Sequence, residues 1–159
     1  MGLFAFIKDA GEKLFGSGEA KAAAPADAAA ANAKAAEAIR NYIAAMQLAP
    51  ADLVVSFDGA RSVVTVAGTA ADQATKEKIL LAAGNIAGVA EVDDQIRVSN
   101  PAPEAQFHTV VRGDTLSAIA KQFYGNANKY PAIFEANKPM LSHPDKIYPG
   151  QVLRIPPQG

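Results

Sequence analysis

Side chains suited to acid–base or nucleophilic chemistry are sparse in this 159-residue chain. It contains two histidines, His108 and His143, and no cysteine. His108 falls in an alternating strand pattern and His143 in a polar Ser-His-Pro-Asp loop, and neither has a serine or carboxylate at a position suggestive of a catalytic pair. A phosphate-binding loop is also missing, because Gly16-Ser17-Gly18 has no strand before it and no Lys-Ser or Lys-Thr after it. The sequence therefore predicts a protein that is not an enzyme.

The charged residues indicate neither a nucleic-acid partner nor a divalent-metal site. Fifteen Lys and Arg against sixteen Asp and Glu give a formal charge of −1, which leaves no basic footprint for nucleic acid. Asp93 and Asp94 are neighbours in a strand pattern and should face opposite ways, whereas hard divalent ions prefer several converging carboxylates. The lack of cysteine excludes disulfides and thiolate zinc sites.

The elements that would position any site are clearest in the last third of the chain, residues 107–157. Apolar positions first alternate as in a strand and then take helical spacing; they are Phe107, Thr109 and Val111, followed by Leu116, Ile119, Ala120 and Phe123. At the switch, Gly113 can supply a turn and Asp114 can cap the helix. Tyr124-Gly125 ends that helix, a second follows with Pro131 in its first turn, and a strand closes the unit, which predicts the order β-α-α-β.

This unit resembles a LysM domain in its Gly-Asp-Thr-Leu turn and its Ile-x-Pro-Gly-Gln-x-Leu-x-Ile-Pro close. The family binds N-acetylglucosamine-containing glycans, such as peptidoglycan, in a shallow groove. The resemblance implies a groove formed by Asp114, Thr115, Leu116, Asn137, Ile147 and Tyr148. The same residues can instead be fold determinants, with Asp114 a cap, Leu116 and Ile147 core, and Asn137 a satisfied loop amide.

Residues 27–99 carry a second unit with the predicted order α-β-β-α-β. A helix over about 27–48 precedes two β-rich runs around Asp58-Gly59, which predicts a hairpin. A second helix begins near Thr69, capped by its hydroxyl with Asp72 at the third position, and ends at Gly84. A strand follows over 90–98. This order and its glycines resemble a BON domain, so the chain is predicted to be an α+β protein of two small domains.

The remaining segments are short. Residues 1–15 carry a helical stripe of Leu3, Ile7, Ala10 and Leu14 whose few lysines are offset by acids, so we expect packing on the BON sheet rather than on a membrane. Residues 16–26 are alanine-rich and predicted to be flexible, and residues 100–106 form a short, stiff linker.

No feature of the chain predicts export. The N-terminal apolar run is interrupted at Lys8-Asp9, which is too early for a signal peptide, and no run of about 20 apolar residues is present. We expect a cytoplasmic monomer without stable membrane insertion.

Taken together, the Asp9-Ala-Gly-Glu-Lys-Leu segment, the BON unit, the linker and the LysM unit resemble the family of bacterial cytoplasmic potassium-binding proteins. The resemblance implies selective, reversible K⁺ binding without catalysis, as a potassium sensor or buffer, and BON modules are associated with osmotic stress. Glycan binding by the LysM unit is the alternative, and in a bacterial wall it would require export.

Potassium is a large, weakly hydrated cation that several neutral oxygens hold best, as backbone carbonyls do in channel filters. Carbonyls converge at glycine-bearing helix ends, and two such places are Ile7 to Glu12 and Gly84 to Val89. The hypothesis is that these loops meet and enclose one K⁺, with binding ordering the protein. Its ligands would be the main-chain oxygens of Ile7, Ala10, Glu12, Gly84, Ile86 and Val89 or a neighbour of Val89. The alternative is an ordinary pair of helix C-caps.

Overall fold

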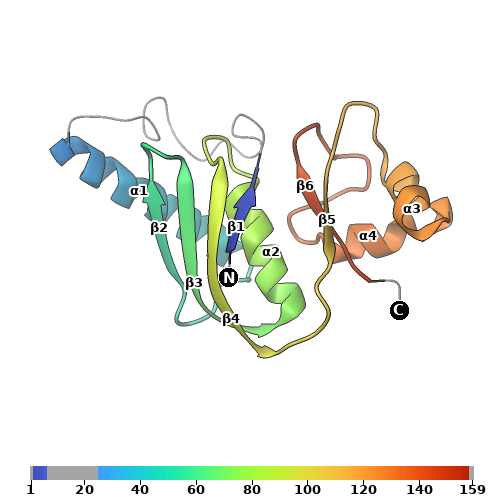
Figure 1. Cartoon of the computed structure of the whole chain (residues 1–159), viewed down its shortest axis with the longest axis horizontal. Helices are drawn as coiled ribbons and strands as arrows, with labels where there is room; N and C mark the ends of the chain where they lie inside the picture. The colour runs from blue at the N-terminus through green and yellow to red at the C-terminus, as the bar shows by residue number, and fades with distance from the viewer. Residues whose placement is uncertain (1, 7–24, 158–159) are drawn as a thin grey trace.

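A computed structural model describes residues 2–6 and 25–157, which form two α/β units side by side (Figure 1). The first contains β1 (Gly2–Ala5), α1 (Pro25–Ala45), β2 (Val54–Asp58), β3 (Val63–Asp72), α2 (Gln73–Gly84) and β4 (Glu91–Asn100). The second contains β5 (Gln106–Thr109), α3 (Leu116–Tyr124), the 3₁₀ turn η1 (Ala127–Lys129), α4 (Tyr130–Ala136) and β6 (Val152–Ile155). The predicted α+β class and both predicted element orders are confirmed.

The first unit is a four-stranded sheet in the order β1-β4-β3-β2, with α1 and α2 packed against it. Strands β2 and β3 form the predicted antiparallel hairpin, where Asp58 Oδ1 accepts the N–H of Ala60 in the turn. Strands β3 and β4 are parallel, so α2 is the crossover between them. In Figure 1, α2 stands between this sheet and the second unit. It is therefore the helix of the first unit that meets the second, and it contacts β6.

Alternation along β4 places its acidic neighbours on opposite faces, as predicted. Asp94 is buried, whereas Asp93 is only partly buried. The buried carboxylate is satisfied, because its Oδ2 lies 3.1 Å from Lys76 Nζ and its Oδ1 accepts the N–H of Ile96. Asp94 is therefore half of an internal ion pair.

The N-terminal helix predicted within residues 1–15 is wrong over Gly2–Ala5, which form the edge strand β1, antiparallel to β4. Phe4 and Phe6 lie two residues apart, at strand spacing, and both pack partly buried against the first core. The outer edge of β4 has N–H and C=O groups that a strand can pair and a helix cannot. The predicted packing of this segment on the sheet thus takes the form of edge pairing, and residues 7–15 lie outside the described residues.

The start of α2 also differs from the prediction. Strand β3 continues to Asp72, and the N–H of Thr69 donates to Asp52 Oδ1 instead of opening the helix. Asp72 is the N-cap, with its carboxylate accepting the N–H of Thr75 at 2.7 Å. Hydrogen bonds from the side chain and backbone of Thr75 hold the pKa of Asp72 below its usual value. The predicted end at Gly84 is confirmed.

The second unit packs α3 and α4 around the two-stranded sheet β5–β6. Thr115 caps α3 by accepting the N–H of Ala118, so the prediction that Asp114 is the cap is wrong. Gly125 ends α3 with φ of 73°, a left-handed conformation that favours glycine. Pro131 lies in the first turn of α4, as predicted.

Candidate functional site

The loop from Gly84 to Val89 follows the C-terminus of α2 and is tightly built. Ile86 and Val89 are fully buried, and the N–H of Val89 donates to the Ile86 carbonyl at 3.0 Å. The last carbonyls of a helix lack intrahelical donors and carry the negative end of its dipole. The last turn of α2 contains no basic residue. This end of the helix therefore suits a cation.

Strand β1 runs directly to this loop. The N–H of Phe6 donates to the Ala90 carbonyl at 2.8 Å. The phenyl ring of Phe6 lies so close to Gly84 that a Cβ at this position would overlap the ring. Gly84 is thus needed for close approach, since any side chain at this position would displace the ring.

The six predicted potassium ligands divide between the described and undescribed parts of the chain. Gly84, Ile86 and Val89 lie together in the loop after α2. Ile7, Ala10 and Glu12 lie outside the described residues. The ligand set stays a prediction.

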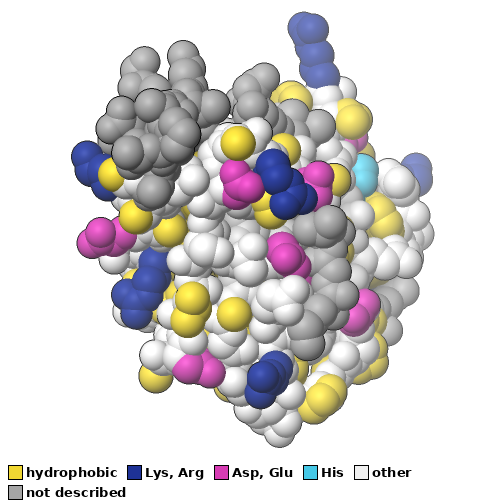
Figure 2. All heavy atoms as spheres, turned by 60° about the vertical axis from the view of Figure 1, so that its left-hand side comes forward, with side chains coloured by type: hydrophobic (Ala, Val, Ile, Leu, Met, Phe, Trp, Pro, Cys, Tyr) yellow, Lys and Arg dark blue, Asp and Glu magenta, His cyan; other side chains and the backbone are white. Residues whose placement is uncertain are grey.

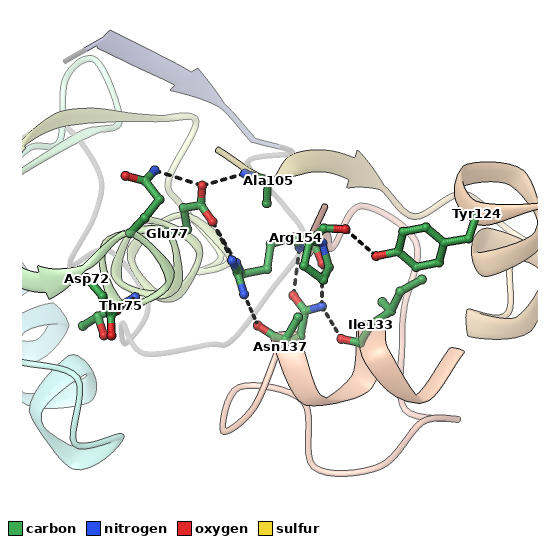
Figure 3. Close-up of polar contacts among 11 residues, drawn as sticks. Asp72, Thr75, Glu77, Ala105, Tyr124, Ile133, Asn137 and Arg154 are labelled. Atoms are coloured by element: carbon green, nitrogen blue, oxygen red, sulfur yellow. Dashed lines mark hydrogen bonds and ion pairs between the residues drawn. The ribbon is translucent and has the colours of Figure 1, made fainter. Parts of the chain in front are cut away.

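A buried polar cluster that the sequence reasoning missed joins the two units (Figure 3). Glu77 on α2 is 2% exposed, and its Oε1 lies 2.7 Å from Arg154 Nη2 and 3.0 Å from Arg154 Nε on β6. The other oxygen, Oε2, accepts hydrogen bonds from Gln73 Nε2 and from the N–H of Ala105 in the linker. One carboxylate therefore contacts a helix, the linker and the far domain.

The outer edge of β6 is completed by two asparagine side chains. Asn137 accepts the N–H of Arg154 through Oδ1 and donates to its carbonyl through Nδ2, both at 2.9 Å. Asn85, within the loop after α2, does the same for Val152 at 2.9 and 2.8 Å. Arg154 is a charged residue within an otherwise apolar strand, and this pattern could have indicated a buried ion pair. No feature of the sequence indicated the contact made by Asn85.

The residues predicted to line a glycan groove differ in how deeply they are buried. Leu116 and Asn137 are buried, and Asn137 also donates to the Ile133 carbonyl, so its amide is fully engaged. Ile147 and Tyr148 are partly buried. Thr115 and Leu116 line a hollow of about 330 Å³, together with Ser117, Tyr130, His143, Pro144 and Asp145.

His108 has a carboxylate partner, contrary to the sequence prediction. Its Nε2 lies 2.9 Å from Asp114 Oδ2, which also accepts the N–H of Val111. The hydrogen bond from His108, followed by that from Val111, lowers the pKa of Asp114. This pair ties β5 to the turn before α3 and accounts for Asp114 as a fold determinant.

Within the part of the chain that the structure describes, neither the charges on the face drawn in Figure 2 nor the acidic side chains form a cluster that would bind a charged partner. Figure 2 shows acidic and basic side chains interspersed over one face, without gathering by sign. No three His, Asp or Glu side chains within residues 2–6 and 25–157 converge as metal ligands would. In the same described part of the chain, every helix is too short or too polar to cross a bilayer.

Comparison with known families agrees with the architecture. A BON domain model matches residues 31–100, and a LysM domain model matches residues 108–156. The exact domain bounds given by the sequence reasoning stay predictions.

Relatives include a potassium binding protein, Kbp, of Escherichia coli O6:H1, which is 51% identical over 156 residues. That alignment covers 98% of this chain and 99% of the relative. An esterase of Mycobacterium tuberculosis is 49% identical over 53 residues, which are 33% of this chain and 11% of the esterase. So short a match is no evidence of esterase activity in this chain. An uncharacterized protein of Deinococcus radiodurans is 49% identical over 49 residues, 31% of this chain and 19% of that protein. Because the first alignment spans both chains almost completely, the protein belongs to the Kbp family, with BON and LysM domains.

Proposed function

We propose that this chain binds K⁺ reversibly and selectively, through main-chain oxygens, without catalysing a reaction. The observation that carries the proposal is its 51% identity, over nearly all of both chains, with a relative described as a potassium binding protein. The ligands proposed are the carbonyls of Gly84, Ile86 and Val89 with those of Ile7, Ala10 and Glu12.

The geometry at Phe6 supports this ligand set. Phe6 is hydrogen-bonded to Ala90 and packed on Gly84, so the chain leaves β1 beside the loop that follows α2. Ile7 is the next residue. Neutral carbonyls at a helix C-terminus offer a field strength suited to a monovalent ion, and several of them can replace its hydration shell.

The entropy lost on fixing β1 opposes its docking, so an ion that binds the docked form can shift the docking equilibrium. Fixing residues 2–6 costs about 5–10 kcal/mol of backbone entropy at about 1–2 kcal/mol each. Two partly buried phenylalanines return at most about 3–6 kcal/mol, and backbone hydrogen bonds add about 0.5–1.5 kcal/mol each. An ion that binds only the docked form stabilises that form by RT ln(1 + c/Kd), where c is the K⁺ concentration, so the docked population rises with K⁺ concentration and the chain can act as a sensor.

Calorimetric titration tests the proposal. At constant ionic strength, KCl should give saturable heats with one ion per chain, whereas NaCl and MgCl₂ should give only dilution heats. The physical reason is that a carbonyl cage sized for K⁺ leaves Na⁺ loosely held and cannot meet the octahedral, hydrated preference of Mg²⁺. Equal heats for KCl and NaCl, or no saturation with KCl, would dismiss it.

The proposal includes the roles of sensor or buffer, a cytoplasmic location and a monomeric state. The first of these requires that K⁺ concentrations near the dissociation constant change the population of ordered molecules.

Glycan binding is the second candidate, favoured by the hollow beside Thr115 and Leu116, whose wall includes the exposed residue Tyr130. An aromatic face next to polar side chains can stack on a sugar ring. An N-acetylglucosamine oligosaccharide titrated in the same calorimeter separates the candidates, since saturation by the sugar with no response to KCl would favour the glycan function.

A further inference from the structure

Asn85 lies between two of the proposed ion ligands, Gly84 and Ile86, yet its side chain points to the other domain. Its amide makes a two-point contact with the backbone of Val152 on β6, donating to the carbonyl at 2.8 Å and accepting the N–H at 2.9 Å. Its own N–H donates to the Leu81 carbonyl at 2.8 Å, which fixes the residue to the end of α2. Backbone and side chain are thus both engaged.

The contact has the form of a strand pairing. Among the strands of residues 2–6 and 25–157, β6 pairs with β5 alone. Its other edge would leave backbone groups unpaired without the two asparagines. On that edge, Asn137 of the LysM domain pairs with the backbone N–H and C=O of Arg154. Asn85 of the BON domain pairs with the backbone of Val152, two residues earlier in β6. The edge of the LysM sheet is complete only when the loop after α2 is docked on it.

From this we infer that Asn85 is the positioning residue of the proposed potassium loop, and that the LysM domain sets ion affinity by holding the loop through Val152. The inference rests on the proposed function. A carbonyl cage is selective only if its oxygens are held at the right separation, and a two-point anchor on the residue between two ligands restricts both. Linkage requires the reverse effect, so K⁺ should tighten the Asn85–Val152 contact.

The test is KCl titration of the full chain carrying Asn85→Ala, with Asn100→Ala as the matched control. Asn100 also uses its amide across segments, donating to the Ala71 carbonyl at 3.1 Å, but it lies at the end of β4 away from the loop. Losing the two hydrogen bonds of Asn85 should raise the dissociation constant about tenfold, while the control stays within about twofold. Equal affinity of Asn85→Ala and the parent would overturn the inference and leave the proposed function standing.

A second variant separates positioning from charge. Asn85→Asp keeps the shape but sets a carboxylate oxygen against the Val152 carbonyl, so binding should weaken. If the side chain served only as a nearby dipole, the added negative charge would tighten K⁺ binding, and that result would overturn the inference.

Two readouts distinguish positioning from a general loss of stability. In Asn85→Ala the KCl-induced rise of the unfolding midpoint should shrink relative to the parent, whereas a merely structural residue would lower the midpoint equally with and without KCl. In the parent, the Val152 amide should exchange more slowly in KCl than in choline chloride, and unchanged exchange would contradict the link. A parent that does not bind K⁺ would overturn the proposed function first, and this inference with it.

Discussion

Replacing Arg154 by methionine should lower the free energy of unfolding by about 3–5 kcal/mol. Glu77 is almost completely buried, and both guanidinium contacts to its Oε1 would disappear, leaving an uncompensated charge between the domains. Such a loss is a large part of the total stability of a small protein. Urea unfolding followed by circular dichroism measures it.

The matched comparison is the exposed pair Lys138–Glu135, whose side chains are 45% and 66% exposed. Lys138→Met should cost no more than about 1 kcal/mol, because solvent screens that pair. The double variant Glu77→Leu/Arg154→Met should recover only part of the loss caused by Arg154→Met. It removes both charges together, but it also takes away the carboxylate oxygen that accepts hydrogen bonds from Gln73 Nε2 and the N–H of Ala105. A cost below about 1 kcal/mol for Arg154→Met alone would mean that the pair is not buried in solution.

Replacing Gly84 by alanine should weaken potassium binding more than tenfold and lower the free energy of unfolding by about 0.5–2 kcal/mol. In a helix the exchange would ordinarily stabilise by about 1 kcal/mol. Here the added methyl occupies the position of the Phe6 ring, which must swing out and give up about 1.5–3 kcal/mol of burial. Ring displacement also moves the start of the segment that carries Ile7. Denaturant unfolding and KCl titration measure the two effects.

A compensating change tests the mechanism. Phe6→Leu removes the far end of the ring, so the pair Phe6→Leu/Gly84→Ala should lose less than the sum of the two single variants. Gly84→Ala that gains stability and keeps its affinity would show that the ring does not occupy this position.

Much of the fold could be predicted from the sequence because it is encoded locally. Turn chemistry at Asp58, the helix stop at Gly84, Pro131 in a first helical turn and the left-handed Gly125 each follow from residue type and spacing. The errors arise where long-range pairing overrides local pattern. The stripe beginning at Leu3 reads as a helix by itself, yet Gly2–Ala5 form a strand because β4 offers an open edge.

The candidate site could be predicted only in part, for a physical reason. Main-chain oxygens leave no pattern of side chains in a sequence. The glycines of the loop from Gly84 to Val89 indicated where carbonyls could converge, but the sequence could not show whether they do. The contact between Asn85 and Val152 spans 67 residues of chain, and no local rule connects them. Likewise, residue type and position predicted Asp114 as the cap of α3. In the structure Thr115 is the cap, and Asp114 is hydrogen-bonded to His108.

Anomalous diffraction from crystals of the full chain grown in RbCl tests the claim that main-chain oxygens hold one K⁺, because Rb⁺ resembles K⁺ in size and scatters anomalously. We expect one strong peak where the loop after α2 meets the segment following Phe6. Main-chain oxygens should surround it, those of Gly84, Ile86 and Val89 and of Ile7, Ala10 and Glu12. Absence of a peak at that junction, or a peak held by carboxylates elsewhere, would contradict the claim.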